Sequence, residues 1–343
     1  LNITNNTDIL EFEKQYSGSQ NNLATALKEF PPKAWIAFIE NLGIKTFLGT
    51  SGRYFVKDMK ASKLLRAWIK RLNERKVEFL YEHECIGFKV DRNKIELSFS
   101  NKKPVAFDAA CFALGGASYE PANDPVKWPN IFKTLKIEPF RPSNVGYQVK
   151  WHIKFLQEAE GLPLKNISLT SSKGTRSGDL VVTKYGLEGT PVYTLGEIGT
   201  VFLDLKPGLE IKDILKKCQT KENLSPIRRV KKQLKLSDAS LALLFHETPS
   251  EILSDLPKLA ERIKHFPIKF IGSQPLPEAI SSAGGISFSE VNKDLMLKKH
   301  PGVFLAGEML DWDAPTGGFL IQGCVSQGYI AGSGVIKYLH EHV

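Results

Sequence analysis

The sequence predicts an α/β protein that also contains a β-rich module, and three patterns indicate this class. An uninterrupted apolar run over 109–114 ends at two glycines, which is typical of a strand buried on both faces of a parallel sheet. Amphipathic helical segments precede it, the clearest over 61–74, where apolar residues recur on one face. Short strands separated by glycines follow over 145–206, as in a β-barrel or a β-sandwich.

Composition sets the size and class of the protein. The 343 residues are 42% hydrophobic, which is enough for a large core and for about two or three domains. No apolar run approaches the ~18 residues that span a bilayer, and the first residues lack the basic and apolar regions of a secretory signal. The four cysteines are widely separated, form no C-x-x-C and suit a reducing compartment. We therefore expect a cytoplasmic protein without membrane contacts.

The first half of the chain alternates helices and short strands. Residues 20–43 are expected to be helical, with a restart at Pro31-Pro32, and two short strands are expected within 47–56. The helix over 61–74 comes next. The strands expected after it occupy 77–81, 85–90, 95–99 and 109–114. The strands over 85–90 and 95–99 are expected to form a hairpin.

The second half begins with a proline-rich stretch over 121–145, which predicts a boundary between domains. The strands over 145–206 lie beyond it, and residues 209–265 return to a helical pattern. The last strand, over 302–306, leads into a glycine-rich turn and a final helix. This half therefore predicts a β-rich module with a helical segment inside it.

Residues 302–319 carry the clearest chemical pattern, in which a strand, a turn, a loop and a helix start follow one another. Gly307 lets a backbone approach a ligand without a Cβ, and the carboxylate of Glu308 can accept hydrogen bonds from the hydroxyls of a ribose or ribityl chain. Gly317 and Gly318 open the final helix, whose free N–H groups favour negative charge. The alternative is an ordinary strand–turn–helix whose glycines only serve the turn.

Five segments, in order along the chain, resemble motifs of the BaiN/YhiN-type family of FAD-dependent oxidoreductases. The strongest is the unbroken run A-G-E-M-L-D-W-D-A-P-T-G-G over 306–318, which resembles the signature of one flavoprotein subfamily. The other four segments are Leu1–Thr4, Thr50–Phe55, Ala113–Ser118 and Ala279–Gly285. Together they extend the resemblance over nearly the whole chain.

The resemblance implies a Rossmann-like FAD-binding domain, interrupted by a β-barrel-like insert that carries a helical subdomain. The implied parts are the FAD-binding domain over 1–140 and 281–343, the insert over 141–208 and 266–280, and the helical subdomain over 209–265. The family opens with a β-α-β unit whose G-x-G-x-x-G turn holds the FAD pyrophosphate. No such turn occurs in these 343 residues, so we expect this chain to lack the N-terminal β-α-β unit and its phosphate cradle.

The implied activity is NAD(P)H-linked hydride transfer through FAD to a small-molecule acceptor that the sequence does not identify. The residues implied to surround the ribityl chain and the flavin ring are Gly307, Glu308, Thr316, Gly317, Gly318 and Phe319. The residues implied to lie near the ring are Asn2, Gly284 and Gly285, and those implied to pass close to the dinucleotide are Gly115 and Gly116.

Two further residues have competing interpretations. Cys85 falls where related flavoproteins contact adenine through the backbone, but a buried core thiol fits the same strand equally well. Arg53 can fork onto an anionic group of a substrate or a nicotinamide nucleotide, but a surface ion pair accounts for it equally well. Arg53 is the best candidate for a substrate contact, and no catalytic side chain is assigned, because the flavin itself carries the chemistry.

A basic run over 228–235 supports a different function. It could contact RNA or an acidic partner, but a solvated helix face is the simpler explanation, since no aromatic residues are interleaved for stacking. Two alternatives to the oxidoreductase therefore stay open: an RNA-associated flavoprotein of the tRNA-modifying type, and a flavin-binding module without turnover. The histidines show no metal-ligand spacing, and no metal site is expected.

Overall fold

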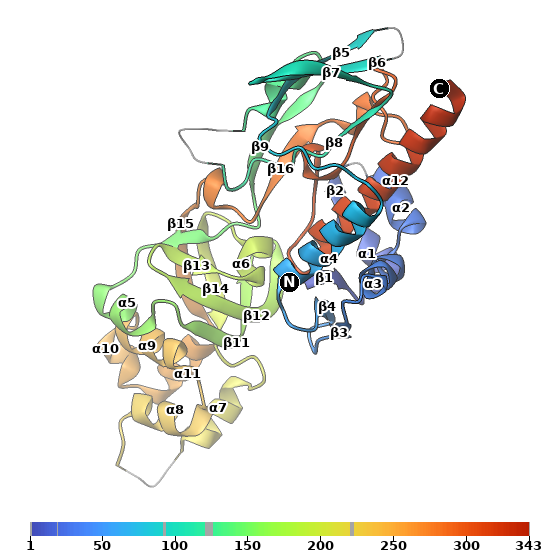
Figure 1. The fold of residues 1–343 in the computed structure, drawn as a ribbon. Helices are drawn as coiled ribbons and strands as arrows, with labels where there is room; N and C mark the ends of the chain where they lie inside the picture. The colour runs from blue at the N-terminus through green and yellow to red at the C-terminus, as the bar shows by residue number, and fades with distance from the viewer. Residues whose placement is uncertain (1, 19, 92–93, 121–125, 220–222, 343) are drawn as a thin grey trace. The chain divides into compact units, whose positions relative to one another are not determined.

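The structure is a computed structural model that describes residues 2–18, 20–91, 94–120, 126–219 and 223–342 (Figure 1). Contacts between residues divide the chain into two compact units. Unit 1 comprises Leu1–Arg141 and Ser281–Val343, and unit 2 comprises Pro142–Ile280. Unit 2 is thus inserted into the sequence of unit 1.

The centre of unit 1 holds a parallel strand pair, β8 (Ala110–Phe112) and β17 (Val303–Leu305). Parallel pairing confirms the expectation from the apolar run, and β17 is buried along its length. The expectation that β8 is buried on both faces is wrong, because the side chain of Cys111 is exposed. Among the described residues β8 pairs with β17 alone, and a ribbon of two strands leaves part of its own surface uncovered.

The last helix of the chain packs against both strands of this pair. The long helix α12 (Phe319–His342) packs against α2 (Gln20–Glu29) and follows two glycines, as expected. The proline pair separates α2 from α3 (Pro32–Asn41), since a proline is tolerated at the first position of a helix. The remaining helices of the unit are α1 (Ile9–Glu13) and α4 (Ala61–Glu74), the latter with the predicted bounds.

The strand expected over 77–81 is wrong. The backbone N–H of Val77 donates to the carbonyl of Leu72, and Lys76 has a left-handed φ of 61°. These contacts close the last turn of α4 in the manner of a helix C-cap, so the chain turns back where a strand would have to extend. Val77 and Leu80 are exposed as a result.

Small antiparallel sheets complete unit 1. One sheet has the order β1 (Asn2–Asn5), β4 (Arg53–Val56), β3 (Thr46–Leu48), and it includes the two short strands predicted within 47–56. A second contains the predicted hairpin, β5 (Cys85–Asp91) and β6 (Lys94–Phe99), and a third strand that the sequence did not indicate, β7 (Lys102–Phe107). The other two pairs are β2 (Ser17–Gly18) with β18 (Trp312–Asp313), and β9 (Ile137–Ser143) with β16 (Ser281–Ile286).

The proline-rich stretch over 121–145 is more regular than expected. Residues 121–125 lie outside the described part of the chain, but a 3-10 helix, η1 (Trp128–Phe132), and strand β9 follow. Prolines in β9 are tolerated because the strand pairs on one edge only, with β16. The other 3-10 helices are η2 (Leu276–Glu278), η3 (Phe288–Glu290) and η4 (Gly307–Met309).

Unit 2 contains a closed six-stranded barrel, which decides between the two β architectures expected from the sequence. Around the barrel the strands are β10 (Tyr147–Val149), β13 (Gly186–Glu188), β12 (Gly174–Thr183), β11 (Pro163–Ser171), β14 (Gly199–Asp204) and β15 (Phe266–Ser273). Alternate apolar side chains fill its core, among them Leu169, Leu180 and Phe270.

Helices occupy the segments between the barrel strands. The first two are α5 (Ile153–Ala159) and α6 (Thr190–Leu195). The stretch between β14 and β15 carries α7 (Ile211–Cys218), α8 (Pro226–Leu234), α9 (Asp238–His246), α10 (Ser250–Leu253) and α11 (Leu256–Lys264). Within the described residues of both units, no helix has the length and apolar character needed to cross a membrane.

Candidate cofactor site

Two glycine turns lie together at one edge of the parallel strand pair. Gly115-Gly116 follows β8 and Gly307-Glu308 follows β17, and the carboxyl ends of parallel strands meet at the same edge of a sheet. A Cβ at Gly116 would lie 3.6 Å from the Cβ of Glu308 and would collide with the Oγ of Ser282. That Oγ accepts a hydrogen bond of 2.8 Å from the backbone N–H of Ala117. The absence of a side chain at Gly116 therefore lets three segments meet.

The turn at Gly307 is held from both sides. Gly307 has a left-handed φ of 83°, which glycine adopts without strain. Its N–H donates to Oε1 of Gln327 at 3.0 Å, and its carbonyl accepts from Nε1 of Trp312 at 2.9 Å. These bonds fix the position of the next residue, Glu308.

The carboxyl group of Glu308 lies in a partly dry environment. Burial raises its pKa, and the neighbouring charge of Asp313 raises it further. Burial also raises the pKa of the Cys324 thiol to about 12, with Glu308 as the second cause, so this thiol stays protonated at neutral pH. Among the described residues no side chain or backbone donor bonds to the carboxylate of Glu308, which leaves it able to accept ligand hydroxyls.

A second cluster surrounds the start of α12. Gly317 and Gly318 have φ values of 118° and 98°, and a Cβ at Gly318 would lie 2.6 Å from the Cα of Thr4. A Cβ at Gly317 would lie 3.2 Å from Nε of Arg53. Strand pairing sets Arg53 opposite Asn5, whose Nδ2 donates to the carbonyl of Gly317 at 3.5 Å. The structure thus brings the predicted substrate contact to the predicted helix start.

Three of the predicted cofactor residues have clear packing roles. A Cβ at Gly284 would lie 2.5 Å from the carbonyl oxygen of Pro139, and one at Gly285 would lie 2.5 Å from that of Met309. Neighbouring backbone atoms therefore leave no room for a side chain at either position. Phe319 packs its ring 4.7 Å from that of Phe12. The predicted contacts of these three residues with a flavin stay predictions, as do those of Asn2 on β1 and of Thr316.

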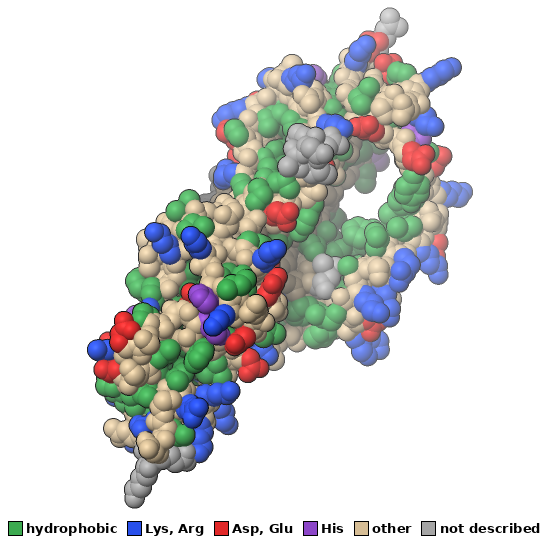
Figure 2. All heavy atoms as spheres, turned by 90° about the vertical axis from the view of Figure 1, so that its left-hand side faces the viewer, with side chains coloured by type: hydrophobic (Ala, Val, Ile, Leu, Met, Phe, Trp, Pro, Cys, Tyr) green, Lys and Arg blue, Asp and Glu red, His purple; other side chains and the backbone are tan. Residues whose placement is uncertain are grey.

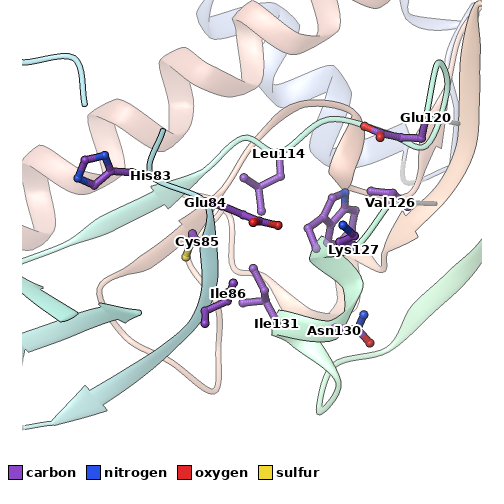
Figure 3. Close-up of a pocket in the computed structure, with 11 residues that line it drawn as sticks. His83, Glu84, Cys85, Ile86, Leu114, Glu120, Val126, Lys127, Asn130 and Ile131 are labelled. Atoms are coloured by element: carbon purple, nitrogen blue, oxygen red, sulfur yellow. The ribbon is translucent and has the colours of Figure 1, made fainter. Parts of the chain in front are cut away.

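A hollow of about 660 Å³ lies beside Gly115 (Figure 3). Leu114, Ile86 and Ile131 point into it, and its wall includes Trp128, whose Nε1 donates to the carbonyl of Gly115 at 3.1 Å. Cys85 lines the same hollow, and burial raises the pKa of its thiol. The lining is mixed, because Glu84, Glu120 and Lys127 also belong to it. The contact of Cys85 with adenine stays a prediction.

Buried polar atoms without partners mark places where a ligand can complete hydrogen bonds. Within the described residues, seven buried side-chain atoms make no hydrogen bond, and three of them lie close to the glycine turns: Oγ1 of Thr4, Oγ of Ser118 and Nε2 of Gln327. Such atoms are costly unless something satisfies them. All three lie on segments that contact the glycine turns or directly follow one, so the residues present fit a polar ligand.

Sequence reasoning missed several of these residues. Ser282 belongs to the A-I-S-S-A-G-G segment, so its motif offered a signal, but its contact with Gly116 spans 166 positions. Thr4 likewise belongs to the Leu1–Thr4 motif segment, but its contact with Gly318 joins opposite ends of the chain. Gln327 and Trp128 carried no signal, because a helical and an aromatic residue have obvious core roles. In the described residues no three His, Cys, Asp or Glu side chains are grouped to hold a metal ion.

Comparisons with known proteins bear on this geometry. The chain is similar to Sdh1 of Mycobacterium smegmatis in complex with UQ1, at 15% identity and a TM-score of 0.42, over 96% of this chain and 57% of that one. It is also similar to GidA of Aquifex aeolicus, at 10% identity and a TM-score of 0.38, over 95% of this chain and 56% of that one. A third similar structure is a protein of Photorhabdus luminescens subsp. laumondii described as an FAD-containing monooxygenase, at 13% identity and a TM-score of 0.32, over 95% of this chain and 81% of that one. The chain thus spans little more than half the length of the first two structures.

The family comparison is decisive, because it does not depend on these distant structures. The model of the HI0933-like protein Rossmann domain matches residues 1–334, which is nearly the whole chain. The protein therefore belongs to the HI0933-like family, the BaiN/YhiN-type flavoprotein family that its five sequence motifs resemble.

Proposed function

We propose that this chain binds FAD in unit 1 and acts as a flavin-dependent oxidoreductase, with NAD(P)H as the electron donor and a small molecule as the acceptor. The observation that carries the proposal is the meeting of Gly116, Ser282 and Glu308 at the carboxyl edge of the parallel strands. When bound, FAD supplies hydride transfer between donor and acceptor.

Each cluster has a role in this proposal. The carboxylate of Glu308 accepts hydrogen bonds from the ribityl hydroxyls, and the hollow beside Cys85 and Leu114 takes the adenine end. The N–H groups at the start of α12 face negative charge on the flavin ring. Arg53, beside Gly317, holds an anionic group of the nicotinamide nucleotide or of the acceptor.

Titration of the 343-residue protein with FAD, followed by quenching of flavin fluorescence, tests the binding. We expect weak but saturable binding, because no G-x-G-x-x-G turn within these residues offers amides to the pyrophosphate. Absence of saturation at any concentration contradicts the proposal.

Turnover is tested separately, with NADH or NADPH and a dye as electron acceptor. Oxidation that depends on added FAD supports an oxidoreductase. Saturable FAD binding without any oxidation of either nucleotide favours the alternative of a flavin-binding module.

A further inference from the structure

Helices α7 and α8 of unit 2 hold most of the excess positive charge of the chain. Residues 211–235 contain nine Lys and Arg against two Asp and Glu, a net charge of +7, while the whole chain carries +9. This stretch contains no aromatic residue. The charge is therefore concentrated in less than a tenth of the sequence.

The cations of α8 form a stripe. Arg228, Lys231 and Lys232 occur at spacings of three and four residues, which places them on one face of α8, and Lys235 follows as the C-cap residue. All four are exposed. The opposite face buries Val230 and Leu234 in the core of the unit. The stripe therefore faces solvent.

Helix α7 adds cations to the same part of the unit. Lys212, Lys216 and Lys217 are exposed, and α7 packs against α8. The one carboxylate of α7, Asp213, accepts from the backbone N–H of Glu210 in a capping box. Figure 2 shows Lys and Arg side chains gathered over the lower end of this unit.

Intramolecular ion pairs do not explain this concentration. Among the described residues, six of these cations take part in no ion pair and in no side-chain hydrogen bond: Lys212, Lys216, Lys217, Arg228, Lys231 and Lys235. Lysines elsewhere in the unit do find partners, as Lys264 does with Asp204 at 2.6 Å. Six cations without counter-ions on two adjoining helices repel one another, so a polyanion stabilises their arrangement.

The chemistry of the face selects among polyanions. Insertion into a bilayer needs a free apolar helix face, and the apolar faces of α7 and α8 are buried. A protein partner needs apolar or aromatic anchors, and a single nucleic-acid strand needs aromatic platforms, but α7 and α8 carry no aromatic residue. The exposed ring of Phe245 on α9 lines a hollow beside α8 that Glu158 and Asp238 also line. Phosphate contacts by Lys and Arg need neither anchors nor platforms.

We propose that α7 and α8 bind the sugar–phosphate backbone of a double-stranded nucleic acid, without reading its sequence. Arg228 and Lys231 also line a hollow of about 330 Å³, but Glu158 and Asp238 line it too and would repel phosphates. The contact is therefore expected along the outer edge of the stripe and on α7. This inference is independent of the flavin.

The test measures binding of the 343-residue protein to a labelled 20-base-pair duplex by fluorescence anisotropy between about 50 and 200 mM KCl. The variant replaces Lys216, Arg228, Lys231 and Lys235 by Gln. The matched control replaces four exposed lysines of unit 1, Lys33, Lys45, Lys102 and Lys103, by Gln. Both lose four charges, so the comparison separates position from net charge.

We expect the α7–α8 variant to weaken binding by roughly tenfold or more at the lower salt concentration, and to reduce the slope of log K against log[KCl] by roughly 3 to 4, because each phosphate contact contributes about 0.9. The control should change this slope by less than about 0.9, which is the contribution of one phosphate contact. RNA and DNA duplexes of the same sequence should bind within about tenfold of each other, as expected for backbone contacts.

Four results would overturn the proposal. They are no binding to either duplex by the parent protein, equal losses in variant and control, a strong preference for one base sequence, and tighter binding to vesicles of phosphatidylcholine and phosphatidylserine than to duplexes. Circular dichroism of both variants checks that a loss of binding is not a loss of fold.

Discussion

The glycine turns of unit 1 and the basic face of α7–α8 in unit 2 both suit ligands that carry phosphate, but they are built in opposite ways. The turns contain few charged side chains, chiefly Glu308 and the neighbouring Arg53, and their shape depends on the absence of side chains at Gly116, Gly317 and Gly318. The basic face contains little besides charge, and its side chains are long and exposed.

This difference sets how each region should respond to change. In the turns, neighbouring backbone lies within 3 Å of where a Cβ would be placed at Gly318, so one methyl group is enough to disturb the region. On the basic face six of the described cations take part in no ion pair or side-chain hydrogen bond, so effects should follow the number of charges and the salt concentration. The predictions below test this contrast, starting with the largest expected effect.

Replacing Gly116 by Val should abolish saturable FAD binding. The new side chain would collide with the Oγ of Ser282 and press against Glu308, whose carboxylate is proposed to accept hydrogen bonds from the ribityl hydroxyls. Gly87→Val is the matched control, since a Cβ at Gly87 meets no atom within 4 Å. Fluorescence titration measures both variants, and normal FAD affinity in a folded Gly116→Val protein would remove this turn from the site.

Replacing Gly318 by Ala should destabilise unit 1 by roughly 1–3 kcal/mol, because φ is 98° and the Cβ would meet the backbone of Thr4. Gly332→Ala in the same helix has open space around its Cβ, and it should stabilise the protein by about 0.5–1 kcal/mol. Gly334 is a poorer control, because its Cβ would lie 2.8 Å from the ring of Phe304. Urea denaturation measures the pair, and equal midpoints would contradict the close contact with Thr4.

Replacing Glu308 by Gln should stabilise the ligand-free protein at neutral pH. The pKa of Glu308 is raised in the folded state, so its ionised form opposes folding. Protonated Glu308 therefore raises the free energy of unfolding relative to ionised Glu308. This contribution is fully present below the unfolded pKa of about 4.3, and it is lost as the pH rises through the folded pKa. The difference in melting temperature between Glu308→Gln and the parent should therefore grow from pH 4 to pH 7. A difference that does not depend on pH would show that Glu308 titrates normally.

The α7–α8 variant described above should leave FAD affinity unchanged, because those side chains belong to unit 2 and the proposed cofactor contacts belong to unit 1. The same fluorescence titration measures it. A loss of FAD binding by the folded variant would contradict the separation of the two regions.

Local patterns predicted much of the fold. The amphipathic period gave α4 its bounds, and the glycine-separated strands became the barrel of unit 2. The segment 77–81 failed because its apolar residues have the composition of a strand, but a helix C-cap uses the N–H of Val77. Composition cannot reveal which backbone groups are already bonded.

The site was predictable only in part, for a related reason. The strand–turn–helix pattern singled out Glu308 and Gly318 locally, whereas Gly116 was implied by the family resemblance, and the contacts of all three with a cofactor stay predictions. The contacts that explain them join residues far apart in the chain, such as Gly116 with Ser282 and Gly318 with Thr4. No periodicity within one element indicates such pairs.

The insertion of unit 2 has a consequence for the order in which the chain folds during synthesis. Pro142–Ile280 is continuous, so every strand of the barrel is available once residue 280 has left the ribosome. Strand β8 must wait for β17, about 190 positions later, before its parallel partner exists. At roughly 5–20 residues per second, this delay lasts on the order of ten seconds or more. During that time β8 has no native partner strand, so the incomplete unit 1 exposes apolar surface that the finished unit buries.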